Sequence, residues 1–383
     1  MAPPLLSSRT VGGLNRALVL RALSSHGPLS RSDLARLAGV TRATIGSIVQ
    51  GLLDDGVLAE GDPVEDGSVG KPARPLWFAA GAGAAVAVDI RASGAHAALI
   101  DARGDVFLER AAAFDDTSSP DAVAGTVRRL ATDLARRGPV IGVGIAVPGS
   151  TDLATGEVVG SIQVPGAVGR RLRDDVAQAT GLPTFVENDS RAQALAEWWF
   201  GAGRGLSTYA SVQTGDGLSV GLVLDGAVYR GPNGLAGELG HTTVAIDGEP
   251  CTCGLRGCWE TIAALAWLRR RGRELGLRGA RDLDAERLAA LARRDARASA
   301  LLDEYADHVA VGLANLRSLL GVEHYVVHGD VVGGGDELRR LLNDAIDRRA
   351  LGRVRVVFSD LGERASILGA AAVVLAELLH APG

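Results

Sequence analysis

The sequence predicts an α/β protein in which a small helix-turn-helix module precedes two related α/β halves. Three observations support this fold class: charge changes abruptly within residues 1–70, hydrophobic residues recur there at helical spacing, and a strand–loop–strand pattern occurs twice further along. Hydrophobic residues make up 47% of the chain but aromatic residues only 4%, which indicates a large Ala/Val/Leu-rich core. We find neither an apolar run that could span a bilayer nor a secretory signal pattern, so we expect a cytoplasmic protein without a membrane partner.

The charge at the N-terminal end is unevenly distributed. Residues 1–50 hold six arginines and one acid, whereas residues 51–70 hold six acids and no base, which indicates a module with one basic face. Helical spacing predicts a first helix that ends near Gly27. Ser30 and Thr41 are the expected N-caps of two further short helices, separated by a turn at Gly39. This arrangement is typical of a helix-turn-helix.

The stretch "VLAEGDPVEDGSVGKPARPLWF" that follows predicts a strand, an acidic loop and a second strand, as in a β-wing. A purely structural three-helix cap is the alternative, but the basic helices together with the wing favour DNA binding. We therefore predict a winged helix-turn-helix domain over residues 1–78 and an α/β domain over residues 79–383. The residues expected to contact bases or phosphates are Arg31, Thr41, Arg42, Thr44, Ser47, Gln50, Lys71 and Arg74.

The α/β part repeats one pattern. Apolar stretches at 84–90, 95–101 and 105–111 predict three strands, followed by a helix around 120–137 and a buried strand in "VIGVGIAVPG". Near residue 208 the pattern of strand, glycine-containing loop, strand, Asp-Gly turn and strand begins again. Two such halves indicate a duplicated α/β unit, with a ligand cleft between the copies.

All three cysteines of the chain lie close together, at Cys251, Cys253 and Cys258. In a reducing compartment, clustered cysteines are metal ligands more often than they form disulfides. The sequence therefore predicts a metal-binding loop in the second half.

Four segments resemble the ROK family of repressors, open-reading-frame proteins and sugar kinases. They are "AVPGSTDLATGEV" at 146–158, "ENDSRAQALAE" at 187–197, "GELGH" at 237–241 and "CTCGLRGCWE" at 251–260. The N-terminal segment resembles the winged helix-turn-helix of ROK repressors, which the kinases lack. The resemblance implies an actin-like (ribonuclease H-like, ASKHA) fold of two α/β lobes, with a sugar in the cleft and, in kinase members, ATP beside it.

The resemblance also implies two sets of ligands. The family's zinc ligands correspond to His241, Cys251, Cys253 and Cys258, in a loop of about 241–260. A closed set of four ligands leaves no open position for catalysis, so this zinc would be structural; free thiols, or another thiophilic metal, are the alternatives. The family's hexose ligands correspond to Asn188, Asp189, Glu238, His241 and Glu260. In zinc-bearing members one ring nitrogen of the histidine binds the metal and the other faces the sugar.

The nucleotide loops depart from the kinase pattern. Where the family's kinases have DxGGT, this chain has Asp89 followed by Arg91, Ala92 and Ser93, whose side chains should obstruct backbone approach to a phosphate. The second loop, "TGDGLSVG", introduces Asp216, and the third, "VVHGDVVGGG", has a single glycine where kinases have a pair. We therefore expect no bound ATP and no catalytic residue, and predict a sugar-responsive transcriptional regulator, most simply a repressor of carbohydrate genes.

Two other functions stay open. Asp189, which corresponds to the general base of the kinases, is retained, so the chain could be an ATP-dependent hexose or N-acetylhexosamine kinase with a DNA-binding head. The third hypothesis is a sugar-binding adaptor whose N-terminal helix-turn-helix module contacts another protein. For the regulator we expect a homodimer or homotetramer on a pseudo-palindromic operator, with a sugar effector that either induces or co-represses. Lys71 replaces the arginine of the family's Gly-Arg-Pro wing, so it keeps the charge but loses the planar fork.

Overall fold

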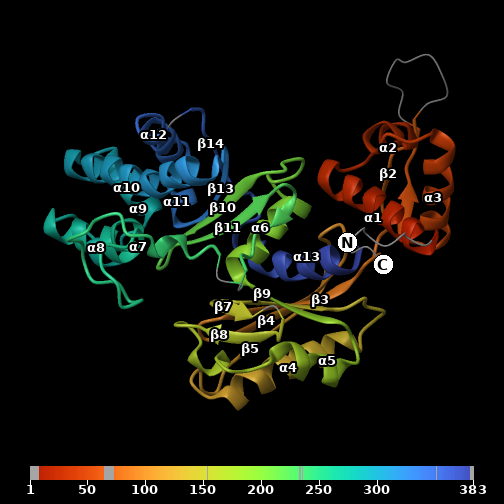
Figure 1. Cartoon of the computed structure of the whole chain (residues 1–383). Helices are drawn as coiled ribbons and strands as arrows, with labels where there is room; N and C mark the ends of the chain where they lie inside the picture. Colours follow the sequence, from red (N-terminus) through yellow and green to blue (C-terminus); the bar gives the residue numbers. More distant parts are fainter. Residues whose placement is uncertain are drawn as a thin grey trace, which may run out of the picture. The chain divides into compact units, whose positions relative to one another are not determined.

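The computed structural model describes residues 8–63, 73–152, 154–232, 234, 236–350 and 352–379. The chain forms two compact units, unit 1 (Met1–Phe200 and Ser366–Gly383) and unit 2 (Gly201–Ala365), whose elements are labelled in Figure 1. No helix within the described ranges is long and apolar enough to cross a membrane.

Unit 1 begins with three helices and a two-stranded sheet. They are α1 (Ser8–His26), α2 (Arg31–Ala38), α3 (Arg42–Asp54), β1 (Leu58–Glu60) and β2 (Leu76–Phe78). Ser30 and Asp33 form a reciprocal capping box at the start of α2, and Thr41 caps α3 through the backbone N–H of Thr44. Gly39 ends α2 in the left-handed conformation, with φ at 65°. β1 and β2 pair antiparallel, so the predicted helix-turn-helix and the strands of its wing are confirmed.

The rest of unit 1 is built on a five-stranded sheet of order β5-β4-β3-β6-β9. Its strands are β3 (Ala85–Arg91), β4 (Gly94–Ile100), β5 (Val106–Ala113), β6 (Val143–Val147) and β9 (Thr184–Asn188). β3, β4 and β5 form an antiparallel meander, whereas β6 and β9 run parallel to β3. A short hairpin, β7 (Ser150–Asp152) and β8 (Glu157–Gly160), and the 3-10 turn η1 (Pro165–Ala167) follow β6.

Helices cover both faces of this sheet (Figure 1). α4 (Pro120–Ala135) and α5 (Leu172–Thr180) lie on one face, and α6 (Asp189–Phe200) and α13 (Ala365–Leu379) lie on the other. A Cβ on Gly144 of β6 would lie 1.9 Å from the carbonyl oxygen of Ala370, so α13 packs directly on the strand.

Unit 2 repeats the same sheet. Its order is β12-β11-β10-β13-β14, again an antiparallel meander followed by two parallel strands. The strands are β10 (Tyr209–Thr214), β11 (Ser219–Leu224), β12 (Ala227–Val228), β13 (His324–Gly329) and β14 (Arg355–Phe358). Asp225 and Gly226 both have positive φ, as a two-residue hairpin turn requires. The predicted duplication is confirmed by this identical order.

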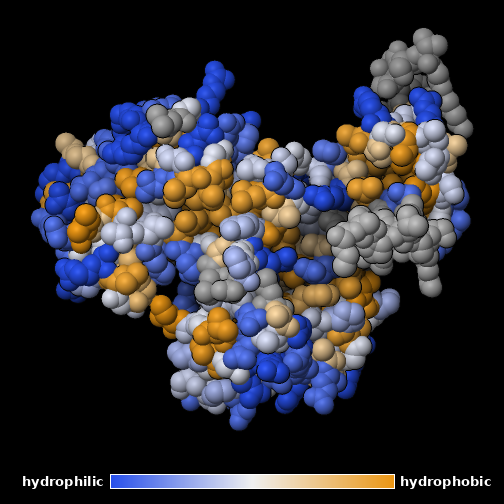
Figure 2. All heavy atoms as spheres, in the orientation of Figure 1, coloured by the Kyte–Doolittle hydropathy of each residue, from blue (hydrophilic) through white to orange (hydrophobic). Residues whose placement is uncertain are grey.

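The helices of unit 2 are α7 (Glu260–Ala263), α8 (Leu265–Glu274), α9 (Ala285–Ala292), α10 (Ala296–Leu320), α11 (Asp330–Gly333) and α12 (Gly335–Asp347), with 3-10 turns η2 (Leu239–His241), η3 (Ala280–Asp282) and η4 (Gly362–Arg364). Four of these helices, namely α7, α8, α9 and α12, pack against α10. α12 buries Leu338, Leu342 and Ile346, and the surface around it is mainly hydrophilic in Figure 2.

Candidate functional site

The four predicted metal ligands lie together in unit 2. The ligand atoms of His241, Cys251, Cys253 and Cys258 are all within 4.8 Å of one another. Nδ1 of His241 is 3.5 Å from Sγ of Cys251, and Sγ of Cys253 is 3.7 Å from Sγ of Cys258. Tetrahedral zinc, with Zn–S about 2.3 Å and Zn–N about 2.0 Å, places its sulfurs about 3.8 Å apart and sulfur and nitrogen about 3.5 Å apart. These side chains fit such a metal, whereas no disulfide spans 3.7 Å.

The loop that carries the cysteines is held by its backbone. The N–H of Cys251 donates to the carbonyl of Leu255 at 2.8 Å, which closes a tight turn that contains Cys251 and Cys253 and precedes Cys258. Gly257 has φ at +66°, and a Cβ there would lie 1.7 Å from the carbonyl oxygen of Ala245, so only glycine fits. Burial, together with the hydrogen bonds and charges of Cys253 and Cys251, raises the pKa of Cys258 to about 12. Without a cation Cys258 is therefore held as a thiol, and a metal would be what allows all three sulfurs to act as thiolates together.

Three of the five predicted sugar ligands lie in unit 2: His241 belongs to the cluster, and Glu260 and Glu238 are close to its residues in the chain. Glu260 begins α7, where its Oε2 accepts the N–H of Leu218 at 3.0 Å and its Oε1 lies 4.0 Å from Sγ of Cys251. Glu238 is exposed and stands directly before η2, whose last residue is His241. Because Nδ1 of His241 faces the cysteines, its Nε2 is left for another partner. Trp259, between Cys258 and Glu260, is fully buried and donates its indole N–H to the carbonyl of His308 at 2.8 Å, which fixes this segment on α10.

The other two predicted sugar ligands, Asn188 and Asp189, lie in unit 1 where β9 meets α6. Oδ1 of Asn188 accepts the N–H of Ser190 at 3.1 Å and of Arg191 at 3.2 Å, so Asn188 is the N-cap of α6. Its Nδ2 donates to the carbonyl of Gly149 at 2.9 Å and to the carboxylate of Asp189 at 3.1 Å. The amide of Asn188 thus fills its hydrogen-bonding capacity within the chain, and a sugar hydroxyl would have to replace one of these partners.

A buried ion pair that the sequence analysis missed supports this junction. Nε of Arg191 donates to Oε1 of Glu187 at 2.6 Å, and both side chains are 1% exposed. The same Oε1 accepts the N–H of Asn188 at 2.9 Å, and Nη2 of Arg191 donates to Oγ1 of Thr151 at 3.3 Å. The signal was the Glu and Arg four residues apart in "ENDSRAQ", but spacing alone cannot show that both are buried.

In the first nucleotide loop both oxygens of Asp89 are engaged. Oδ2 accepts Nε of Arg91 at 2.7 Å, and Oδ1 accepts the hydroxyl of Ser366 at 2.6 Å. Arg91 therefore covers the carboxylate from the position where the kinases have a glycine. This contact supports the interpretation that the loop does not cradle a phosphate.

The second and third loops lie at one sheet edge, because β10 and β13 are parallel neighbours with Thr214 opposite Gly329. Asp216 of the second loop pairs with Nη1 of Arg269 at 3.1 Å. Asp330, in the third loop, accepts the N–H of Ala285 at the start of α9 and the hydroxyl of Tyr305, both at 3.0 Å. Burial raises the pKa of the Asp330 carboxyl, an effect that these two hydrogen bonds oppose. Each of the two loops thus contains an aspartate, Asp216 or Asp330, whose carboxylate is bound by a donor from elsewhere in unit 2.

The predicted DNA-contacting residues of α3 are open to solvent. The exposed residues are the N-cap Thr41 together with Arg42, Thr44, Ser47 and Gln50, whereas Ile45, Val49 and Leu52 are buried on the opposite side.

The remaining predicted DNA contacts flank the wing. Arg31 hydrogen-bonds to Oε1 of Glu60, and Nη1 of Arg74 lies 4.0 Å from Oε2 of the same carboxylate. Glu60 therefore connects the start of α2 to the wing strands, a contact that the sequence analysis did not predict. Lys71 lies outside the described residues.

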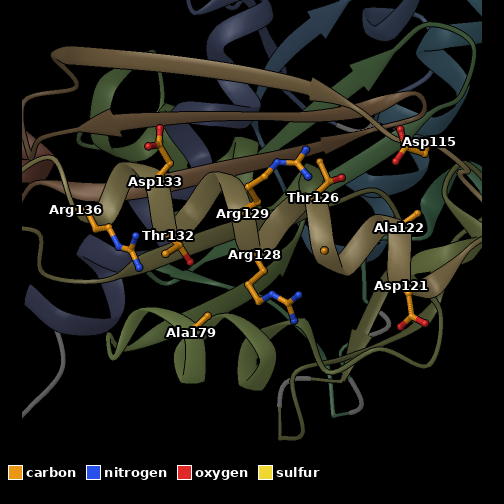
Figure 3. A pocket seen from close by; sticks show the side chains of 11 residues that line it. Asp115, Asp121, Ala122, Thr126, Arg128, Arg129, Thr132, Asp133, Arg136 and Ala179 are labelled. Carbon is orange, nitrogen blue, oxygen red and sulfur yellow. The ribbon is translucent and has the colours of Figure 1, made fainter.

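A surface hollow of about 650 Å³ lies along α4, with Ala179 of α5 at its edge (Figure 3). Its lining combines Arg128, Arg129 and Arg136 with three aspartates. Asp133 already pairs with Arg137 at 3.0 Å. The lining contains none of the five predicted sugar ligands, so we interpret the hollow as a solvated charged groove.

Comparison with known proteins agrees with this geometry. The ROK family model matches residues 85–377, and the MarR family model matches residues 13–67. A putative xylose repressor from Caldicellulosiruptor sp. (strain Rt8B.4) is 27% identical over 96% of this chain and 97% of its own length. A glucokinase from Thermotoga maritima is 35% identical over 61% of this chain and 78% of its own length.

Among solved structures, a ROK family transcriptional regulator, a homologue of the E. coli MLC protein, matches with a TM-score of 0.78 and 26% identity. The match covers 97% of both chains. The predicted fold, a winged helix-turn-helix followed by a ROK sugar-kinase-like α/β fold, is therefore confirmed. Because the family model spans most of the sequence, this chain belongs to the ROK family.

Proposed function

We propose that the chain is a sugar-responsive DNA-binding transcriptional regulator, and specifically a repressor of carbohydrate genes. The observation that carries this proposal is the share of this chain that aligns with regulators and with kinases. The repressor relative and the regulator structure align with 96% and 97% of this chain, winged helix included, whereas the glucokinase aligns with 61%. We assign DNA binding to residues 1–78 and sugar binding to residues 79–383.

The proposed sugar ligands are Asn188, Asp189, Glu238, His241 and Glu260. Their carboxylate, amide and imidazole groups suit the mixed donors and acceptors of sugar hydroxyls. The proposed metal is one structural zinc on His241 and the three cysteines, supported by sulfur and nitrogen spacings that match a tetrahedral ion. Bound there, zinc would fix the ring of His241 so that its other nitrogen can face a sugar.

We expect this protein to bind DNA without phosphorylating sugar. Two contacts support this. Arg91, which replaces a glycine of the kinase loop, binds the carboxylate of Asp89, and Asp330, next to the single glycine of the third loop, accepts the N–H of Ala285. We assign Asp189 a sugar-binding role and no catalytic one.

A homodimer or homotetramer presenting two winged helices would read a pseudo-palindromic operator in the cytoplasm. The sugar would act by binding the DNA-competent and DNA-incompetent states with different affinity. Induction and co-repression are both compatible with these residues.

Fluorescence anisotropy tests the proposal. Labelled fragments from upstream of this gene and its neighbours are titrated at fixed salt with competitor DNA, then again with D-xylose, D-glucose or N-acetyl-D-glucosamine. We expect tight, sequence-dependent binding that one sugar changes by about tenfold or more. Absence of specific binding on every fragment would contradict the proposal and favour a protein-contacting adaptor.

A sugar kinase is the second candidate, because Asp189 is retained and the glucokinase relative is 35% identical over the shared part. Incubation with ATP, Mg²⁺ and the same sugars distinguishes the two. Sugar phosphate formed by the wild type and lost in Asp189→Asn would establish the kinase. No sugar phosphate above the protein-free blank from either protein would eliminate it.

A further inference from the structure

We propose that α6 connects sugar binding to the DNA-binding domain, and that Arg21 against Trp198 is the contact through which it does so. This inference rests on the proposed function, because it assumes that a sugar binds at Asp189. One end of α6 carries Asp189, and the other end carries Trp198 and Trp199.

The first turn of α6 is rigidly joined to the predicted sugar ligands. Asn188 caps the helix, Asp189 is its first residue, and the buried Glu187–Arg191 pair spans the junction at 2.6 Å. A displacement of Asp189 by a bound sugar is therefore a displacement of the helix end itself.

The middle of α6 is enclosed. Every residue from Ser190 to Trp199 is buried. A Cβ on Gly369 of α13 would lie 2.3 Å from the carbonyl oxygen of Ala192, so the two helices touch backbone to backbone. At 1.5 Å per residue this helix spans about 18 Å, and a helix packed this closely shifts as one body, since cores deform little.

The far end of α6 contacts the winged helix-turn-helix at two places. The guanidinium carbon of Arg21, on α1, is 5.5 Å from the centroid of the Trp198 ring, within the range of a cation–π interaction. The ring of Phe78, the last residue of β2, is 5.9 Å from the ring of Trp199 at an interplanar angle of 40°. Trp198 and Trp199 are 6% and 1% exposed and Phe78 is 6% exposed, so the contact between Phe78 and Trp199 is buried on both sides. Arg21 is exposed, so it covers the buried Trp198 ring from the solvent side.

These contacts reach the two parts of the domain that position its DNA-binding surface. α1 packs against α3, the recognition helix, and β2 is a wing strand. A shift of α6 therefore changes the placement of both, which is what a sugar needs in order to alter DNA affinity.

The test compares Arg21→Gln with Arg16→Gln. Both arginines lie on α1 and lose the same charge, but Arg16 pairs with Asp55 of the DNA-binding domain itself at 2.6 Å. For each protein the dissociation constant for a labelled promoter fragment is measured without sugar and with saturating D-xylose, D-glucose or N-acetyl-D-glucosamine. The ratio of the two constants is the coupling factor.

We expect Arg21→Gln to lower the coupling factor at least about threefold while its dissociation constant for the sugar alone stays within about twofold of wild type. Arg16→Gln is expected to retain the wild-type factor. A second variant, Trp198→Phe, keeps an aromatic ring with a weaker cation–π interaction, and should give an intermediate factor.

An unchanged coupling factor in both Arg21→Gln and Trp198→Phe would overturn the proposal, even if either variant binds DNA less tightly, because a purely structural contact shifts both constants equally. A wild-type coupling factor of one for all three sugars would instead contradict the proposed function itself. The two failures are therefore distinguishable.

Discussion

The Glu187–Arg191 pair shows how much of this site depends on residues that touch no ligand. Both charges are nearly inaccessible, and their hydrogen bonds hold the backbone of Asn188 and the hydroxyl of Thr151. A buried ion pair of this kind contributes little net stability, but removing one partner leaves the other charge buried and uncompensated, which is strongly destabilising.

Arg191→Met is expected to lower the free energy of unfolding by about 3–5 kcal/mol, because it leaves Glu187 buried without its partner. Urea denaturation followed by circular dichroism measures the change. Arg128→Met, at an exposed position of α4, is the matched control and should cost less than about 0.5 kcal/mol. Equal stability of the two variants would refute the assigned role of the pair.

Metal content tests the cysteine cluster. We expect about one zinc per chain in the purified protein by mass spectrometry, and loss of that zinc, with a lower Tm, in Cys258→Ser. Thr252→Ala, at an exposed position between two ligands, should keep the metal. A wild-type protein prepared with zinc that carries no metal would contradict the assignment.

His328 predicts a pH dependence of stability. Burial lowers its pKa to about 4 from an ordinary value of 6.5. Because the unfolded chain binds the proton more tightly, stability is intact above pH 6.5 and is lost as pH falls toward 4, by up to about 1.4 kcal/mol per pH unit from this group. His328→Gln should flatten the stability curve between these pH values relative to wild type. Parallel curves for the two proteins would show that the imidazole is not responsible.

At the scale of elements, the sequence predicted the helix ends, because neighbouring residues in the chain determine them. Caps at Ser30 and Thr41 and the stop at Gly39 need only residues that are neighbours in the chain, and all three are as predicted. The joint contact of Arg31 and Arg74 with Glu60 was not predictable, since it joins segments far apart in sequence.

The helix α3 carries a prediction of its own. Arg42 is exposed at its start, so Arg42→Ala is expected to weaken operator binding about tenfold and to leave sugar affinity unchanged. Anisotropy measures the first quantity and calorimetry the second. Arg136→Ala, at the exposed residue that follows α4, should change neither. An equal loss of operator affinity in both variants would mean that the loss comes from the lower net positive charge and not from a specific contact of Arg42 with DNA.

At the scale of the whole molecule, composition and the repeated strand pattern were enough to predict two α/β copies, and the matching sheet orders confirm them. Helices α8 and α9 were not predicted, and both pack against α10, which comes later in the chain. The site residues were predicted by resemblance. The sequence could not show that the side-chain oxygen of Asn188 caps α6, because this depends on the conformation at the start of the helix.

The measurement that tests the central claim most directly is operator binding by wild type and Glu238→Gln across a titration of the effector sugar. Glu238 is exposed beside the metal cluster and lies outside residues 1–78, so its substitution should spare DNA binding. The account predicts equal DNA affinity without sugar, a change of about tenfold or more in the wild type at saturation, and no comparable change in the variant at the same sugar concentration. A sugar that alters neither protein's affinity, or that alters both equally, would contradict it.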